Sequence, residues 1–219
     1  MRRLAVLLIV ACAPLALTGL GWGQLNPRSI AQRASAEDCG GIARWDVKTL
    51  SDPGRSQVEF FPKWTTVHKL VTKTRPDQPI GKDTPRITGV ETTTYRLKAR
   101  LVEAKLIFGS ASKPGDHDIH LVIANPNDPA ETMVVEFPDT TCRGASSSPK
   151  GEQMAAARDA YTAACGGLPS KSKFTMLSGT ATITGVGFFD FPHATGAADT
   201  GIELHPVLKF RSDDCQRTP

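Results

Sequence analysis

Residues 92–108 read TTTYRLKARLVEAKLIF, and we expect this stretch to decide the fold. In its first half the apolar residues hold alternate positions, at Tyr95, Leu97, Ala99 and Leu101. Such alternation is typical of a β-strand with one buried face. At residue 102 the alternation changes phase, and the apolar positions become Val102, Ala104, Leu106 and Phe108. Two adjacent apolar residues at such a change indicate a β-bulge, so we predict one long, bent strand.

Further strands and one helix are expected after this long strand. We predict strands at residues 118–124 and 132–137, a helix between Ser148 and Gly166, and strands at 174–186 and 202–210. Three strands, a helix and two strands is the order of a five-stranded Greek-key barrel of the OB type. The sequence therefore predicts a mainly β fold with one helix, built as an OB-like barrel. A β-sandwich with one helix is the alternative.

The residues before the long strand are expected to form short pieces. Val47 to Leu50 is predicted to be extended, and Val58 to Phe61 is predicted to be a strand that ends before Pro62. Residues 65–74 suit a strand or a short helix, and the spacing of their apolar residues favours the helix.

The first residues predict export. Two arginines precede a short apolar run, and small residues follow, which is typical of a secretory signal peptide at residues 1–23. Pro14 and several glycines interrupt the run, so a membrane-spanning helix of about 20 strongly apolar residues is disfavoured. We expect a flexible leader at residues 24–45 and a single β-rich domain at 46–219, in a secreted, periplasmic or envelope-bound bacterial protein. Cys12 lies in a loose lipoprotein box, which leaves lipidation as an alternative.

The positive charge of the chain is concentrated near its N-terminus. No Asp or Glu precedes Glu37, whereas four arginines do. Removing these four from the 26 Lys and Arg leaves 22, which equals the 22 Asp and Glu. A neutral domain argues against broad electrostatic binding to nucleic acid or to an anionic membrane. Export then suggests a cell-envelope component as the partner.

The cysteine pattern predicts disulfides. An even number in an exported chain indicates two bonds among the four cysteines that follow the signal peptide: Cys39, Cys142, Cys165 and Cys215. Three pairings are compatible with four cysteines. We favour Cys39–Cys215, which would tie the two ends together, with Cys142–Cys165 nested inside. No pair has the two- to four-residue spacing of zinc-binding motifs, so a cysteine metal site is disfavoured.

Ionisable side chains concentrate in two short strings, DHDIH at residues 116–120 and ELHP at 203–206. Within each string they recur at every second residue, so Asp116, Asp118 and His120 should share one face of their strand, and Glu203 and His205 one face of theirs. These faces point outward if Ile119 and Leu204 point into the core. Carboxylate oxygens and imidazole nitrogens are ligands for divalent metals. We therefore name a hypothetical metal site at Asp118, His120, Glu203 and His205, and we assign no catalytic residue.

Two functions compete on this basis. The first is a binding or structural module of unknown ligand, favoured by the neutral surface and by the absence of a catalytic motif. The second is a metal-assisted hydrolase of the phosphodiester type, which would need a divalent metal at the four named residues to activate water. The distance between the His120 and His205 rings discriminates between the two functions. The two residues lie on the second and fifth predicted strands, which are not neighbours in the sheet of an OB barrel, so their proximity cannot be assumed. Ring nitrogens within about 5 Å, near a carboxylate and open to a cleft, would favour the hydrolase.

Residues 185–190 read GVGFFD, and we expect a tight bend there with Phe188 or Phe189 at one end of the barrel. Together with VKTLSDP at 47–53, DHDIHLVI at 116–123 and IELHPVL at 202–208, this string resembles those of a family of exported bacterial proteins of uncharacterised function. The resemblance covers about residues 46–210 and implies no known activity. The chain departs from the family's pattern where Ala194 and Thr195 follow His193 in place of Gly-Gln. It departs again where Gly201, in place of Asn, precedes the IELHP string.

Overall fold

The computed structural model describes residues 39–41, 43–109, 115–191 and 195–218. The predicted signal peptide, Cys12, His193 and most of the predicted leader lie outside these residues. The described residues form eight strands in one mixed sheet, three α-helices and one 3-10 helix. The prediction of a mainly β fold with a helical component is therefore confirmed at this level.

The elements alternate short helices with strands before the long strand, and one longer helix interrupts the strands after it. Their bounds are α2 (Trp45–Lys48), η1 (Pro53–Gln57), β1 (Glu59–Trp64), α3 (Val67–Val71), β2 (Thr93–Leu106), β3 (Ile119–Asn125), β4 (Asp128–Phe137), α4 (Gly151–Ala164), β5 (Thr175–Ser178), β6 (Thr180–Phe189), β7 (Ile202–Arg211) and β8 (Gln216–Arg217). No helix among the described residues has the length and apolar character needed to cross a membrane.

The predicted long strand is β2, and four other strands pair with it. Its first half runs antiparallel to β6, and its second half runs antiparallel to β3. The register with β3 shifts between Leu101 and Glu103, at the position where the apolar alternation changes phase. The predicted bulge is therefore confirmed, and it lets one strand serve two partners.

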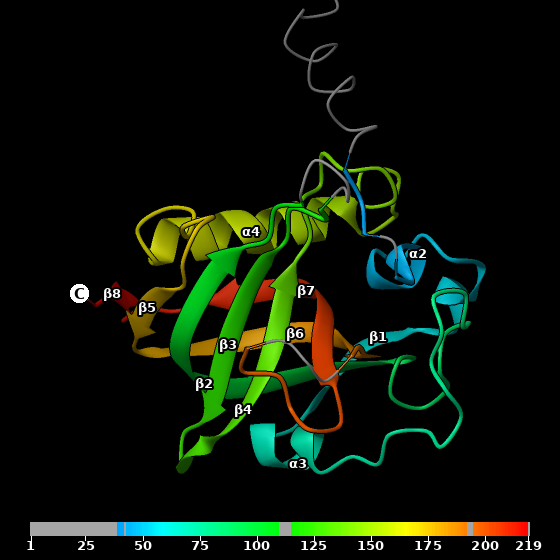
Figure 1. Cartoon of the computed structure of the whole chain (residues 1–219), viewed down its shortest axis with the longest axis horizontal. Coiled ribbons are helices and arrows are strands. Elements are labelled where there is room, and N and C mark those ends of the chain that lie inside the picture. Colours follow the sequence, from blue (N-terminus) through cyan, green and yellow to red (C-terminus); the bar gives the residue numbers. More distant parts are fainter. Residues whose placement is uncertain (1–38, 42, 110–114, 192–194, 219) are drawn as a thin grey trace, which may run out of the picture.

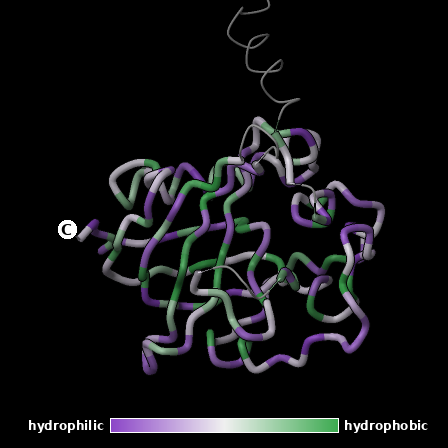
Figure 2. Tube along the Cα trace, in the orientation of Figure 1, coloured by the Kyte–Doolittle hydropathy of each residue, from purple (hydrophilic) through white to green (hydrophobic). Residues whose placement is uncertain are grey.

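The remaining pairings place β4 between β3 and β7. The β3–β4 and β6–β7 pairs are antiparallel, whereas β4 and β7 are parallel. Figure 1 shows α4 across one end of these strands and α3 at the opposite end. Side chains on one face of the strands make the main core, together with Tyr161 of α4. In Figure 2 hydrophobic segments concentrate on the central strands, and hydrophilic ones on the peripheral loops.

Four local predictions were wrong. The strand that was predicted to end before Pro62 continues through it as β1, because Pro62 falls where the register with β2 shifts, between Glu59 and Lys63. The stretch predicted as extended from Val47 begins within helix α2, whose Lys48 is buried by contacts distant in sequence. The strand predicted at 174–186 is divided at Gly179, where φ is +104° and the backbone of Asp214 lies too close for a side chain. The GVGFFD string belongs largely to β6, which continues to Phe189 and shows register shifts against β7 at Gly185 and Gly187 instead of a sharp bend. Gly187 lies too close to Val90 and Tyr95 for a side chain.

The favoured disulfide pairing was also wrong, although the predicted number of bonds is confirmed. The bonds are Cys39–Cys142 and Cys165–Cys215. Cys165 follows the end of α4, and the Arg217 side chain of the terminal strand donates to its carbonyl, so the C-terminus reaches α4 rather than the N-terminal segment. The order of the cysteines in the sequence does not predict that the C-terminus docks against α4.

Candidate metal centre

The two predicted strings come together on the outer face of the sheet. Residues Ile119 and Leu204 point into the core, as expected. The intervening strand β4 joins the strings, because His120 is paired in register with Glu136 and the start of β7 lies on the other side of β4. We call the resulting group the acid–histidine cluster, and it consists of Asp118, His120, Glu136, Glu203 and His205.

Glu136 is the centre of the acid–histidine cluster. One of its oxygens lies 2.8 Å from Nδ1 of His120, and the other lies 2.9 Å from Nδ1 of His205. Glu203 Oε1 lies 3.2 Å from the same His205 nitrogen. All four sequence-predicted residues therefore lie in one cluster, and a residue that the sequence analysis did not name holds them together.

The contact between Asp118 and His205 differs from the others. Asp118 Oδ2 and His205 Nε2 are 3.1 Å apart, and both side chains have no exposed surface. Apart from this ion pair, neither atom has a hydrogen-bond partner among the described residues. The second oxygen of Asp118 accepts from the backbone of Asp139 at 3.3 Å. The two buried atoms are therefore each other's main polar contact.

The cluster is covered by segments from elsewhere in the chain. Lys48 of α2 places its ammonium 2.6 Å from Asp190, which follows β6, and 3.7 Å from Glu136. The same ammonium lies 5.3 Å from the ring centre of Phe188. Nε2 of His120 lies 3.1 Å from the carbonyl oxygen of Thr195. The outer face of β3 and β4 is therefore covered by α2 and by the described residues Asp190 and Thr195, which lie between β6 and β7 in the sequence.

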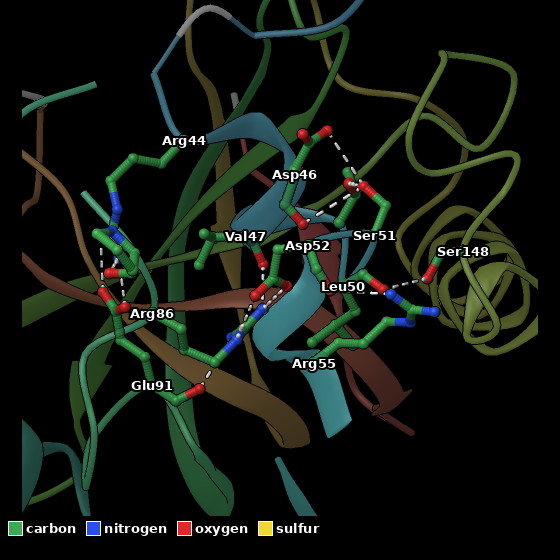
Figure 3. A network of polar contacts seen from close by, with 12 residues as sticks. Arg44, Asp46, Val47, Leu50, Ser51, Asp52, Arg55, Arg86, Glu91 and Ser148 are labelled. Atoms are coloured by element: carbon green, nitrogen blue, oxygen red, sulfur yellow. Dashed lines mark hydrogen bonds and ion pairs between the residues drawn. The ribbon is translucent and has the colours of Figure 1, made fainter. Parts of the chain in front are cut away.

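Buried arginines fix the N-terminal segment in this position. Arg44, next to α2, forms a two-pronged ion pair with Glu91, whose side chain is fully buried. Arg86 bonds to the Asp52 carboxylate and to the Val47 carbonyl, as Figure 3 shows. Because these bonds hold both flanks of α2, Lys48 is directed at the cluster.

The two histidines of the cluster and the Lys48 ammonium that covers it all have raised pKa values. Burial lowers the pKa of Lys48, but Glu136 and Glu203 outweigh it and hold that pKa well above its usual value. Burial also opposes charge on His120, and the hydrogen bond to Glu136 nevertheless raises its pKa to about 9. Against burial and the charge of Lys48, the surrounding carboxylates hold the pKa of His205 well above its usual value.

The acids of the cluster, together with the neighbouring Asp116, divide into two kinds by the direction of their pKa shifts. Burial, reinforced by neighbouring carboxylates, raises the pKa of Asp116 and of Glu203 to about 7. Burial raises the pKa of Asp118 as well. Glu136 is the exception, because Lys48 and the two imidazoles overcome burial and hold its pKa well below its usual value. Glu136 is therefore the anion around which the cations are arranged.

Sequence reasoning missed three contributors. Glu136 had a readable signal, since it alternates with Val135 and Phe137 of the core and so must share a face with its partner His120. Lys48 and Asp190 had none, because their approach depends on how distant segments pack over the sheet. Comparisons of the chain with protein-family models, with curated proteins and with solved structures gave no match.

Proposed function

We propose that the chain is an exported binding module built on an OB-like barrel. Support for closure comes from five pairings that return to their start: β2 with β3, β3 with β4, β4 with β7, β7 with β6, and β6 with β2. The position of α4 between β4 and β6 fits the OB order. This set of pairings favours the barrel over the β-sandwich alternative.

Export belongs to the same proposal. Disulfides persist in oxidising compartments, and the two bonds of this chain suit a secreted, periplasmic or envelope location. A bacterial source and kinship with the resembling family of exported proteins are further parts of the proposal, which rest on the sequence strings alone.

The ligand that we propose for the acid–histidine cluster is a divalent metal ion. The observation that carries this is the pair of buried atoms, Asp118 Oδ2 and His205 Nε2, which lie 3.1 Å apart and have no further hydrogen-bond partner among the described residues. A metal ion bound between them would take the place of the His205 proton. Nδ1 of His205 faces the Glu136 carboxylate, which is the outer partner that a metal-ligating histidine usually has. One oxygen from each of Asp118 and Glu136 lies within 4.8 Å of a nitrogen of His205.

The donor set indicates which cation suits the site. Carboxylate oxygens combined with an imidazole nitrogen suit Zn²⁺ or Mn²⁺, whereas Ca²⁺ and Mg²⁺ prefer sites made of oxygen alone. The cluster offers both donor types within one group. We therefore expect a borderline transition metal to bind more tightly than the alkaline-earth ions.

Burial favours binding over the hydrolase alternative. His205 and Asp118 have 0% of their surface exposed, and His120 and Glu203 have 5% and 6%. A hydrolytic metal needs an open coordination position that both water and substrate can reach. Such limited exposure suits an ion that stabilises the outer face of the sheet better than one that performs chemistry.

Metal analysis combined with thermal unfolding tests the proposal. Binding to the native state alone adds about 2.7 kcal/mol at 100 times Kd. Each kcal/mol raises Tm by about 2–4 °C in a chain of this size. We therefore expect Zn²⁺ or Mn²⁺ to raise the Tm of EDTA-stripped protein by roughly 5–10 °C, and Ca²⁺ or Mg²⁺ to raise it less.

Two variants locate the effect. Asp118→Asn keeps the side-chain volume but removes a charged ligand, so we expect the metal-induced shift to disappear. Glu131→Gln is the matched control, since Glu131 also bonds a histidine, His68 at 2.6 Å, but on the surface. That control should keep the full shift. A wild-type Tm that no divalent ion moves would refute the metal site. Phosphodiester hydrolysis by metal-loaded protein that Asp118→Asn abolishes would favour the hydrolase instead.

A further inference from the structure

A second polar surface lies on the outer face of β2, β6 and the second half of β7, whereas the acid–histidine cluster uses the first half of β7. Three cations of β2 are each paired in register with a threonine of β6. Two of these threonines are in turn paired with cations of β7. We call this surface the basic–threonine face, and it consists of Arg96, Lys98, Arg100, Thr180, Thr182, Thr184, Lys209 and Arg211.

The cations of this face point into solvent. Their neighbours along the strands, such as Leu97 and Phe210, belong to the core, so alternation directs the cations outward. Four of the five are exposed. The fifth, Arg96, is partly buried; it donates to the Thr184 hydroxyl at 3.1 Å and lies 5.5 Å from the ring centre of Trp64. Trp64 itself is 69% exposed beside it.

Positive charge is largely uncompensated on this face. No acid is paired in register with its members along the described β2–β6 and β6–β7 ladders. Acids lie at one end only, where Asp213 forms an ion pair with Arg211 at 3.3 Å and Asp214 accepts from the Thr180 amide at 2.8 Å. The domain is neutral overall, but its charges are distributed unevenly.

The geometry suits a linear anionic chain. Neighbouring strands are about 4.8 Å apart, so the cation columns of β2 and β7 lie about 10 Å apart on either side of β6. A hollow of about 320 Å³ is lined by Lys98, Thr180, Thr182 and Arg211, and at the acidic end of the face by Asp213 and Asp214. A chain lying along β6 would contact hydroxyl groups beneath it and cations on both sides.

We propose that the basic–threonine face binds an anionic polysaccharide. Threonine hydroxyls can donate to and accept from sugar hydroxyls, while the flanking cations bind sulfate or carboxylate groups. Single-stranded nucleic acid is usually held by several aromatic side chains that stack successive bases. Among the described residues, Trp64 is the aromatic side chain that contacts this face. The proposal names a ligand class for the binding module, but it does not depend on the metal site.

Binding of the full-length, oxidised protein to immobilised polysaccharides tests this inference. Heparin serves as the sulfated probe, polygalacturonate as the carboxylated probe and dextran as the neutral one. We expect binding to at least one anionic probe at low salt, loss of binding as salt rises, and no binding to dextran. EDTA should leave the affinity unchanged, which separates a failure of this inference from a failure of the metal proposal.

A charge-matched pair of triple variants then locates the surface. Lys98→Ala, Arg100→Ala and Arg211→Ala together should weaken binding at least tenfold with Tm unchanged, since all three side chains are exposed. The control replaces three exposed cations elsewhere, Lys69, Lys82 and Arg143, by Ala and should bind like wild type. Equal weakening by both triples would overturn the inference, as would failure to bind either anionic probe. Equally tight binding of oligo(dT) that the first triple abolishes would assign the face to nucleic acid.

Discussion

At the scale of the residue, Lys48 makes a crowded group of acids compatible with a folded core. Its ammonium faces three carboxylates, those of Glu136, Asp190 and Glu203. Removing one partner of a buried ionic group leaves uncompensated charge and costs about 3–5 kcal/mol. We therefore expect Lys48→Met to lower the free energy of unfolding by this amount in urea titrations.

The control for this prediction is Lys82→Met. The Lys82 side chain is 77% exposed and faces Asp83 at 3.9 Å, so its removal should change the free energy of unfolding by less than about 0.5 kcal/mol. If Lys48→Met unfolds at the same urea concentration as wild type, then the charge of Lys48 does not hold the cluster together.

The proton balance of the cluster predicts how metal-free protein responds to pH. The pKa of His120 is raised to about 9, so its contribution to stability is complete below its unfolded value near 6.5 and is lost as pH rises through 9. Glu203, whose pKa is raised to about 7, holds a proton that the unfolded chain releases at lower pH, so it too favours folding less as pH rises from about 4 to 7. Both groups act in the same direction.

Thermal unfolding in EDTA between pH 5.5 and 9 should therefore show a falling Tm. The lowered pKa of Glu136 contributes stability that is lost only at acid pH, below this window. His120→Asn should flatten the fall between pH 7 and 9, whereas His68→Asn on the surface should leave it unchanged. A Tm that is constant or rises over this range would show that these protons are not linked to folding.

At the scale of the element, the alternation of apolar residues predicted the strands whose one face meets the core. The alternation in β2 and β3 predicted both strands, and the phase change located the bulge. The sequence pattern did not predict α2, because a helix of four residues is too short to show a hydrophobic period. This helix is held instead by the contacts of Arg44 with Glu91 and of Lys48 with Asp190. The pattern also failed at Gly179, because the close approach of a distant backbone divides β5 from β6 there.

At the scale of the whole molecule, the two disulfides should have separable effects. Each closes a long loop, with sequence separations of 103 and 50 residues, so removing either should cost about 2–4 kcal/mol. Cys39–Cys142 also tethers the segment that carries Arg44 and Lys48 over the acid–histidine cluster. We therefore expect the double variant Cys39→Ala/Cys142→Ala to lose part of the metal-induced Tm shift.

The matched control is Cys165→Ala/Cys215→Ala, which frees the C-terminus from α4 on a different part of the sheet. It should lower Tm comparably while keeping the metal-induced shift. If both double variants keep the shift in full, then the N-terminal tether does not support the cluster.

The sequence by itself determined strands β2, β3, β4 and β7 and the outward direction of Asp118, His120, Glu203 and His205, because the period of a half-buried strand is a local property. Only the tertiary structure decided that Glu136 joins them, that Lys48 covers them and which cysteines pair. Those outcomes depend on register between strands and on the docking of segments far apart in the chain, and both are set by packing of the whole core rather than by any short stretch.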